Sequence, residues 1–284
     1  MARLLRSLLF VPGNNSRFLE KAKSLQADIV CFDLEDSVPL VEKKSARSLI
    51  KNALKNRSEY KSEIYVRTNS PVSGLIPDDL LEIIQKGVDG IVIPKVNTAS
   101  EMKKIEKIML GLEKKRKLKP IEVIASIEST EGVVNAYSIA SCSKRISALV
   151  FGVFDLLNDL GVEYTKKPEG AAYSRAKIPV DARAAGKYAI DAIWQDLDDV
   201  SGLEQDSIVA KNLGYAGKSI IHPNQVDVVH KVFYPTSAEI EWAKKVVSAY
   251  DMAKKNKKGA TTVDGKMIDE VHYKRAISLL HSAK

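Results

Sequence analysis

Short apolar runs alternate with longer segments of helical periodicity along most of the chain. Residues 29–32 and 91–93 are continuously apolar and rich in β-branched side chains, which is typical of strands covered on both faces. Residues 16–25 and 100–114 carry apolar side chains at helical spacing, with Ser or Thr near their starts as caps. This alternation indicates parallel strands joined by crossover helices.

The pattern contains eight strands, which favours closure into a (β/α)8 TIM barrel. The strands are predicted at residues 4–11, 28–34, 63–68, 90–94, 122–127, 148–151, 189–194 and 218–221. Residues 163–170 interrupt the rhythm and are interpreted as a loop inserted after the sixth strand, on the functional rim. We therefore expect a catalytic barrel over residues 1–235.

The remaining residues, 236–284, are predicted to form a C-terminal helical extension or lid. Its expected parts are a helix near residues 237–254, a linker at 255–259 and a tail from Ala260. A chain of 284 residues with 45% hydrophobic residues can bury one substantial core, which suits a single domain with a terminal extension.

The net charge of +8 raises the question of a nucleic-acid partner. The lysines are spread along the predicted helices, and the basic cluster at residues 114–117 marks a helix end. No basic strip with interleaved aromatic residues is present, so no nucleic-acid partner is expected. The positive field would instead attract anionic substrates.

The sequence favours a cytoplasmic protein that is not inserted in a membrane. Cys31 and Cys142 are too few for a disulfide framework and lie in apolar stretches, as reduced thiols usually do. Residues 1–11 are interpreted as a first strand, because their apolar run is short and no small-residue cleavage site follows. No apolar segment approaches the roughly 18–20 residues of a membrane span.

Polar side chains follow most of the predicted strands, at the point where each strand ends. In strand order they are Asn14 and Asn15, Glu35 and Asp36, Arg67, Lys95, Glu128, Asp155 and, after the eighth strand, His222. Any one of them alone could be an ordinary polar loop residue. Because TIM barrels carry their chemistry at the carboxyl ends of the strands, we expect these groups to converge at one mouth. Such convergence would be costly without a metal or anionic ligand to balance the charges.

Glu128 and Asp155 are the candidate ligands of a hard cation, because Mg²⁺ sites often use one or two carboxylates and leave other positions to water and substrate oxygens. Arg67 would offer a fixed fork of donors to a carboxylate or a developing oxyanion. Arg17, at the start of a helix, is either a phosphate-binding cation or a plain solvated residue. Lys95 leaves imine chemistry open in principle, but the carboxylate pair favours metal-assisted enolate chemistry.

Other kinds of site find little support in the sequence. No Cys/His spacing indicates zinc, and neither a Gly-rich nucleotide loop nor a nucleophile elbow occurs. The four histidines show no ligand spacing, and His222 is interpreted as a structural hydrogen-bonding residue near the barrel top. Divalent-cation chemistry on oxygen ligands is therefore the favoured interpretation.

Eight ordered motifs extend over nearly the whole chain. They are RSLLFVPGN at 6–14, DLED at 33–36, RTN at 67–69, PKV at 94–96, IE at 127–128, FGVFDL at 151–156, GKSIIHPNQ at 217–225 and VDGKMID at 263–269. Together they resemble the citrate lyase β-chain-like branch of the HpcH/HpaI aldolase superfamily, which includes malyl-CoA and citramalyl-CoA lyases. Phe154 departs from the family, which often has Glu there, and makes the surroundings of Asp155 less polar.

The resemblance implies a TIM barrel in a homotrimer or homohexamer, with Mg²⁺, or alternatively Mn²⁺, held by Glu128 and Asp155. The other residues that it implies are Arg67 as a catalytic substrate clamp, Glu35 and Asp36 near the metal waters, and Phe10, Arg17, Lys21 and Lys95 in CoA and substrate binding. In members with a C-terminal lid, the residue matching Asp269 is catalytic and reaches the active site of a neighbouring subunit. The alternative is that Asp269 merely caps the helix near residues 273–280.

The expected activity is that of a magnesium-dependent carbon–carbon lyase acting on an acyl-CoA and a small 2-oxo acid. The alternatives are a citryl-thioester lyase β subunit of a citrate lyase complex, a CoA-independent class II aldolase and a malate-synthase-like enzyme. A non-catalytic barrel is disfavoured, because the implied ligands, clamp and acid are all present. Malyl, methylmalyl, citramalyl and citryl thioesters differ by small groups, and discrimination between such groups involves only about 1–3 kcal/mol per methylene.

Overall fold

The computed structural model describes residues 4–166 and 169–283. Residues 1–3 of the predicted first strand and residues 167–168 of the predicted insertion lie outside the described residues. The chain divides into two compact units, one formed by Leu5–His230 and the other beginning at Lys231. The first unit holds the repeating strands and helices, and the second holds the predicted extension.

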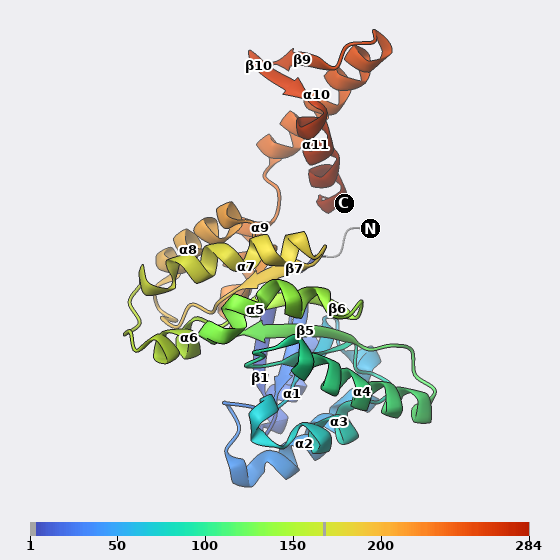
Figure 1. Cartoon of the computed structure of the whole chain (residues 1–284), viewed down its shortest axis with the longest axis vertical. Helices are drawn as coiled ribbons and strands as arrows, with labels where there is room; N and C mark the ends of the chain where they lie inside the picture. The colour runs from blue at the N-terminus through green and yellow to red at the C-terminus, as the bar shows by residue number, and fades with distance from the viewer. Residues whose placement is uncertain (1–3, 167–168, 284) are drawn as a thin grey trace. The chain divides into compact units, whose positions relative to one another are not determined.

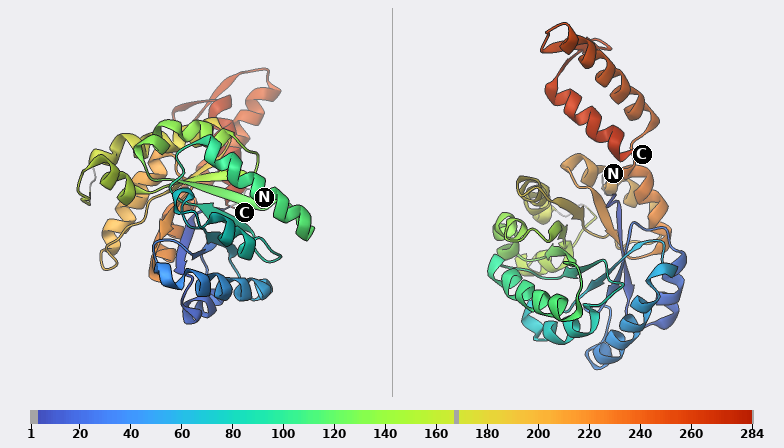
Figure 2. Two further views of the ribbon diagram at one scale, coloured as in Figure 1. Left: turned by 60° about the horizontal axis from the view of Figure 1, so that its bottom comes forward. Right: turned by 90° about the vertical axis from the view of Figure 1, so that its right-hand side faces the viewer.

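Eight parallel strands close into a barrel in the first unit, each paired with the next along the chain and β8 paired back to β1. They are β1 (Ser7–Pro12), β2 (Ile29–Asp33), β3 (Glu63–Arg67), β4 (Gly90–Ile93), β5 (Glu122–Ile127), β6 (Ile146–Phe151), β7 (Tyr188–Asp191) and β8 (Gly217–Ile220). Figures 1 and 2 show the helices on the outside of this barrel. The predicted (β/α)8 TIM barrel is therefore confirmed.

The helices alternate with these strands as the sequence periodicity predicted. They are α1 (Ser16–Lys21), α2 (Lys43–Lys55), α3 (Ile76–Ile83), α4 (Ala99–Arg116), α5 (Thr130–Ser141), α6 (Val153–Leu160), α7 (Ala172–Ala184), α8 (Val200–Leu213) and α9 (Val226–Phe233). The side chains of Asn15 and Thr98 cap α1 and α4 by accepting backbone N–H bonds. Across the described residues, no helix combines the length and apolar character needed to cross a membrane.

The barrel interior is filled by side chains that alternate along the strands. Ile29, Cys31 and Ile124 belong to one buried cluster with Tyr65. The Tyr65 ring fills the space beside Gly90 on the neighbouring strand, where an added Cβ would lie 2.1 Å from the ring. The ring of Tyr65 therefore occupies the space that Gly90 leaves free because it has no side chain.

The seventh strand is shorter than predicted. It ends at Asp191, so the predicted end at residue 194 is wrong. The apolar run continues through Trp194, which is buried, but the pairing of β7 with β8 covers only Ile190 and Asp191. Burial without a strand partner produces the same apolar pattern as a strand.

From Ser237 onward, the second unit consists of two helices and a β-hairpin. Its elements are α10 (Ser237–Lys255), β9 (Ala260–Val263), β10 (Lys266–Asp269) and α11 (Glu270–Ser282). Val246, Val263, Ile268 and Ala276 form its core, so that each element contributes to one small apolar cluster.

The hairpin corrects the sequence interpretation, which had only a tail from Ala260. The turn is formed by Asp264 and Gly265, whose φ angles are 46° and 74°. An Asp-Gly pair with two positive φ angles is a preferred two-residue hairpin turn. The sequence signal was present, but the flanking strands have only four residues each.

Gly90→Ala is expected to destabilise the barrel by about 1–3 kcal/mol, because the added methyl group would overlap the Tyr65 ring. Urea unfolding followed by circular dichroism measures the loss. Gly111→Ala is the matched control, since a Cβ at Gly111 of α4 meets nothing within 4 Å. That change should raise stability by up to about 1 kcal/mol. Wild-type stability of Gly90→Ala would contradict the described packing.

Candidate active site

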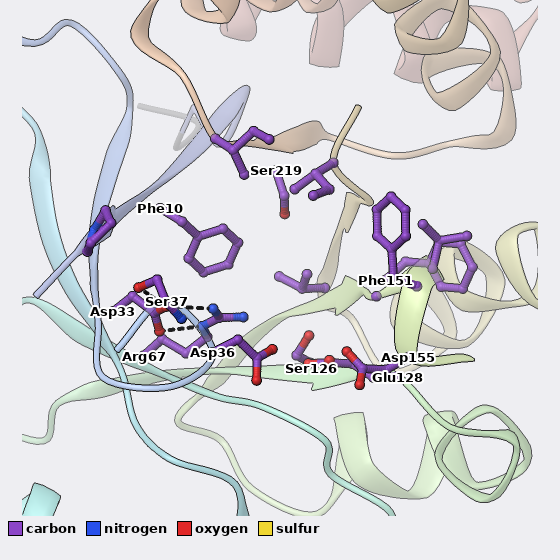
Figure 3. Close-up of a pocket in the computed structure, with 17 residues that line it drawn as sticks. Phe10, Asp33, Asp36, Ser37, Arg67, Ser126, Glu128, Phe151, Asp155 and Ser219 are labelled. Carbon is purple, nitrogen blue, oxygen red and sulfur yellow. Dashed lines mark hydrogen bonds and ion pairs between the residues drawn. The ribbon is translucent and has the colours of Figure 1, made fainter. Parts of the chain in front are cut away.

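A cavity of about 460 Å³ lies at the carboxyl ends of the barrel strands (Figure 3). Five residues of the predicted site line it, namely Phe10, Asp36, Arg67, Glu128 and Asp155. Another part of its wall is apolar and is formed by Val150, Phe151, Val153, Phe154, Ile193 and Ile221. The fold thus brings the predicted carboxylates and the guanidinium together in one cavity with an apolar side.

Arg67, at the end of β3, is held by a buried carboxylate that the sequence analysis did not assign. Its Nε and Nη2 atoms donate to Oδ1 and Oδ2 of Asp33, each at 2.7 Å. Asp33 also accepts hydrogen bonds from the Glu35 backbone N–H and the Ser37 hydroxyl. Burial opposes ionisation of Asp33, but the Arg67 charge and these bonds outweigh it and lower the pKa of the carboxyl. Asp33 therefore fixes the fork of Arg67.

The alternation of inward and outward side chains along β2 is the sequence signal that could have identified Asp33. Ile29 and Cys31 belong to the barrel core, and a period of two along β2 puts Asp33 on the same inward face. The strand register pairs Asp33 with Arg67. Phe10 adds a further contact, because its ring centroid lies 4.5 Å from the guanidinium carbon of Arg67.

Glu128 directly follows β5 and is packed against Gly152. A Cβ at Gly152 would lie 2.5 Å from Cγ of Glu128, so this glycine leaves the space that the carboxylate occupies. Burial raises the pKa of Glu128, and the Asp155 carboxylate adds to the rise. A bound cation would favour the ionised form of such a group.

Asp155 lies in the first turn of α6 and is partly exposed. The preceding residue, Phe154, lines the cavity and packs against Tyr164 with 4.5 Å between ring centroids. Tyr164 belongs to the predicted insertion after the sixth strand. An aromatic pair therefore stands next to the candidate metal ligand.

Glu35 lies between the two cations of the site. Its carboxylate oxygens are 3.1 Å from Nη1 of Arg67 and 3.0 Å from Nζ of Lys95. Burial raises the pKa of Glu35 to about 8. The carboxylates of Glu128 and Asp36 add to this rise, whereas the two cations oppose it.

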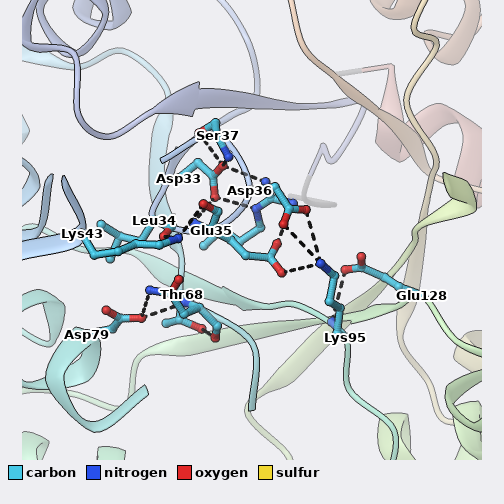
Figure 4. A network of polar contacts seen from close by, with 12 residues as sticks. Asp33, Leu34, Glu35, Asp36, Ser37, Lys43, Thr68, Asp79, Lys95 and Glu128 are labelled. Atoms are coloured by element: carbon cyan, nitrogen blue, oxygen red, sulfur yellow. Dashed lines mark hydrogen bonds and ion pairs between the residues drawn. The ribbon is translucent and has the colours of Figure 1, made fainter. Parts of the chain in front are cut away.

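We use the name acidic cluster for Glu35, Asp36, Glu128 and Asp155. Figure 4 shows the Lys95 side chain reaching toward Glu35 and Asp36, with Glu128 beside it. The backbone N–H of Lys95 also donates to Glu128 Oε1 at 3.2 Å. Lys95 is therefore in contact with the acidic cluster through both its side chain and its backbone.

The carboxylates of the cavity differ from a preformed all-protein metal site. Among residues 4–166 and 169–283, no three His, Cys, Asp or Glu side chains form a group that could hold a metal ion. Glu128 and Asp155 nevertheless suit Mg²⁺, which commonly takes one or two protein carboxylates and completes its shell with water and substrate oxygens. The raised pKa of Glu128 marks a buried carboxylate that a cation would favour in its charged form. The residues present therefore fit a hard divalent cation.

The residues predicted to bind CoA lie around β1 and α1. Phe10 lines the main cavity and also a smaller cavity of about 160 Å³, which Lys21 and His222 line as well. Arg17 is exposed in the same helix as Lys21 and is not among the residues lining the smaller cavity. The His222 ring accepts the Asn224 backbone N–H, as expected of a structural hydrogen-bonding residue.

Asp269 belongs to the second unit, where it ends β10 and caps α11. Its Oδ1 atom accepts the backbone N–H groups of Val271 and His272 at 3.0 and 3.3 Å. The same oxygen lies 2.7 Å from Nδ1 of His272, and these contacts lower the pKa of Asp269. The cap that the sequence left as an alternative is present, and the catalytic role stays a prediction.

Comparison with known proteins places this barrel in a family. The family model for HpcH/HpaI aldolase/citrate lyase matches residues 6–223, from the start of the barrel to just beyond β8. The chain belongs to this family. Membership of the HpcH/HpaI family confirms the resemblance that the ordered motifs carry.

Curated relatives in the HpcH/HpaI family include two named proteins that match over most of their length. The citrate lyase subunit beta of Leuconostoc mesenteroides subsp. cremoris is 36% identical, over 94% of this chain and 89% of the relative. The mitochondrial citramalyl-CoA lyase of Rattus norvegicus is 33% identical, over 97% of this chain and 85% of the relative.

A solved structure is similar to this chain over its whole length. It is the CitE protein of Mycobacterium tuberculosis in complex with magnesium, acetoacetate and coenzyme A. The TM-score is 0.81 at 26% identity, and the match covers 100% of this chain and 99% of that chain. That CitE protein therefore has the same fold.

Glu35→Gln is expected to remove a pH dependence of stability. Because the pKa of Glu35 is raised from 4.5 to about 8, its stabilising contribution is complete below pH 4.5 and is lost as the pH rises towards 8. With a chelator present, the unfolding free energy of the wild type should fall relative to that of the variant, by up to about 1.4 kcal/mol per pH unit. Urea unfolding at successive pH values measures this difference.

The control for this experiment is Glu131→Gln, an exposed change in α5. It should leave the pH dependence of the wild type unaltered. Parallel curves for the wild type and Glu35→Gln would contradict the raised pKa.

Proposed function

We propose that the chain is a magnesium-dependent carbon–carbon lyase that cleaves or forms a 3-hydroxy-3-carboxyacyl-CoA thioester such as malyl-CoA or citramalyl-CoA. Cleavage yields acetyl-CoA or propionyl-CoA together with glyoxylate or pyruvate. The observation that carries the proposal is that Glu128, Asp155 and Arg67 line one cavity at the barrel mouth. Similarity to a citrate lyase subunit beta and to a citramalyl-CoA lyase supports a lyase acting on such thioesters.

Glu128 and Asp155 would hold the magnesium ion, with Glu35 and Asp36 near its waters. The CitE relative contains magnesium, and two carboxylates are a common protein contribution to such a site. When bound, the ion supplies Lewis-acid polarisation of the hydroxyl or oxo oxygen of the acid portion. Manganese, which also prefers oxygen ligands, is the alternative cofactor.

Arg67 is proposed to bind the substrate carboxylate and to stabilise charge that develops on oxygen. Asp33 already holds the guanidinium in place, so little reorganisation is needed when that charge appears. Although burial opposes it, Asp33 raises the pKa of Arg67 and keeps the guanidinium protonated. Arg67 therefore keeps its full charge inside the barrel mouth.

Cleavage moves electrons from a carbon–carbon bond into the thioester. The substrate hydroxyl gives its proton to a carboxylate of the acidic cluster, and its oxygen becomes the carbonyl oxygen of the 2-oxo acid. The bonding pair becomes the acyl-CoA enolate, which Asp269 protonates on carbon. In the synthetic direction Asp269 removes that proton. In this proposal a neighbouring subunit of a homotrimer or homohexamer supplies Asp269.

The CoA portion is proposed to pass Phe10 and to end near α1. Phe10 lines both cavities, and Lys21 lines the smaller one. Arg17, exposed in the same helix, would add a second cation for the CoA phosphates. Lys95 would lie at the thioester end of this path.

A citryl thioester is the second candidate substrate, because one relative at 36% identity is a citrate lyase subunit beta. Such a substrate would sit on an acyl-carrier protein and would carry one carboxylate more than the citramalyl or malyl group. Phe151, Phe154 and Ile193 offer no cation on the apolar side of the cavity. An unpaired carboxylate there would be costly, which favours glyoxylate or pyruvate as the 2-oxo product.

Two further alternatives use the same metal chemistry. A CoA-independent aldolase would accept a truncated thioester or a free hydroxy-oxo acid. A malate-synthase-like enzyme would release free CoA during condensation. Product analysis of the condensation reaction separates both from the proposed lyase.

A cleavage assay with malyl-CoA, citramalyl-CoA and citryl-CoA, with products identified by mass, tests the proposal. The wild type should cleave either malyl-CoA or citramalyl-CoA faster than citryl-CoA. Cleavage should stop when magnesium is chelated. Glu128→Gln should lose magnesium binding in calorimetry and at least about 100-fold in kcat/KM, because it removes a charged ligand of the Lewis acid. Cleavage that continues with excess chelator would refute the metal-dependent mechanism.

Asp269→Asn separates the cap from the catalytic role. Asn caps helices about as well as Asp, so the melting temperature should be retained. Asn cannot transfer the proton, so kcat should fall by about 10²–10⁴-fold with KM changed little. Asp264→Asn, a change in the turn of the same hairpin, is the matched control and should keep full activity. Full activity of Asp269→Asn would refute the assigned role.

A further inference from the structure

Lys95 has a backbone conformation that is unusual for a lysine. Its φ angle is 51°, in the left-handed region that residues with a Cβ seldom adopt. It lies just after β4 (Gly90–Ile93), at the carboxyl end of a barrel strand. Strained backbone of this kind persists where the surroundings impose it, and it is concentrated at functional sites. Here it accompanies a side chain that reaches into the acidic cluster.

The Lys95 ammonium group contacts three members of the acidic cluster. Its Nζ atom lies 3.0 Å from Glu35 Oε1, 3.2 Å from Asp36 Oδ1 and 3.3 Å from Asp155 Oδ1. The fourth member, Glu128, accepts the Lys95 backbone N–H. The ammonium group, which is positively charged as lysines ordinarily are, is thus attracted by several carboxylates at once.

This ammonium group therefore uses oxygen atoms that a divalent cation would also need. Mg²⁺ binds oxygens at about 2.0–2.1 Å and demands a nearly regular shell, so Asp155 cannot direct the same lone pairs at both cations. Two positive charges a few ångströms apart also repel each other strongly in a partly buried site. A lysine fixed at this place opposes the cation that the acidic cluster attracts.

We propose that Lys95 is an internal competitor of the divalent cation, set in place by its left-handed backbone, and that it lowers the metal affinity of the site. Magnesium binding breaks the contact between Lys95 and Asp155 and frees the ammonium group for an anionic substrate. The inference rests on the proposed function only in taking Glu128 and Asp155 as the metal ligands. Lys95 is in this view a positioning residue rather than a metal ligand.

Calorimetric titration of Lys95→Met with Mg²⁺ tests the proposal. Methionine has a similar length and no charge, and the backbone strain stays the same. Its magnesium dissociation constant should be at least about 10-fold lower than that of the wild type, because one nearby positive charge is removed. An unchanged or higher dissociation constant would overturn the proposal.

Lys117→Met is the matched control. Lys117 also has a positive φ angle, 56°, but it is exposed at the end of α4 and takes no part in the ion pairs described above between Lys95 and the acidic cluster. Its substitution makes the same change of net charge and side chain. The magnesium affinity of this variant should equal that of the wild type, and an equal gain in both variants would overturn the proposal.

A second measurement uses the wild-type protein and does not depend on the folding of a variant. Acetylation of lysines by an N-hydroxysuccinimide ester is followed by mass spectrometry with and without saturating Mg²⁺. Lys95 should react several-fold faster with the ion present, while Lys117 serves as the internal reference. An unchanged or slower reaction of Lys95 would contradict its displacement.

Failure of this inference is distinguishable from failure of the proposed function. If Glu128→Gln binds magnesium as tightly as the wild type, the proposed ligand set is wrong. If Glu128→Gln loses magnesium but Lys95→Met does not gain affinity, only the competition is wrong.

Discussion

Negative charge at the barrel mouth exceeds what the two cations beside it can balance, and the geometry of the site follows from that constraint. Five carboxylates lie around Arg67 and Lys95. Asp33 makes a two-point contact with Arg67 and has a lowered pKa. Glu35 lies between Arg67 and Lys95 and has a raised pKa. The position of a carboxylate relative to a fixed guanidinium thus decides whether it is a permanent anion or one that needs a further cation.

The architecture of the barrel could be predicted because strands covered on both faces leave continuous apolar runs in the sequence. The same signal misled at Trp194, where burial continues after strand pairing has ended. The hairpin of the second unit escaped for the opposite reason. Its two strands have four residues each, of which only Val263 and Ile268 are buried, so only the turn at Asp264 and Gly265 was available to mark it.

The site was most predictable where a polar residue ends a strand or directly follows it. Arg67 and Glu128 were found in this way, and the fold brings both into one cavity. Asp33 was not, because the apolar Leu34 continues the run and placed Asp33 inside the predicted strand. The left-handed backbone of Lys95 could not be predicted from the sequence, because lysine has no preference for a positive φ angle. Such a conformation arises from the surroundings and not from the residue itself.

The close fit of Gly152 against Glu128 limits the ways in which this barrel can acquire a different acyl specificity. Any side chain at residue 152 would displace the carboxylate, so the cavity cannot be narrowed from that side. Phe154 lines the cavity from a helix and rests on Tyr164, away from the barrel strands. Evolution or design of acceptance for bulkier acyl groups would therefore proceed through this aromatic pair, leaving the ion-binding end intact.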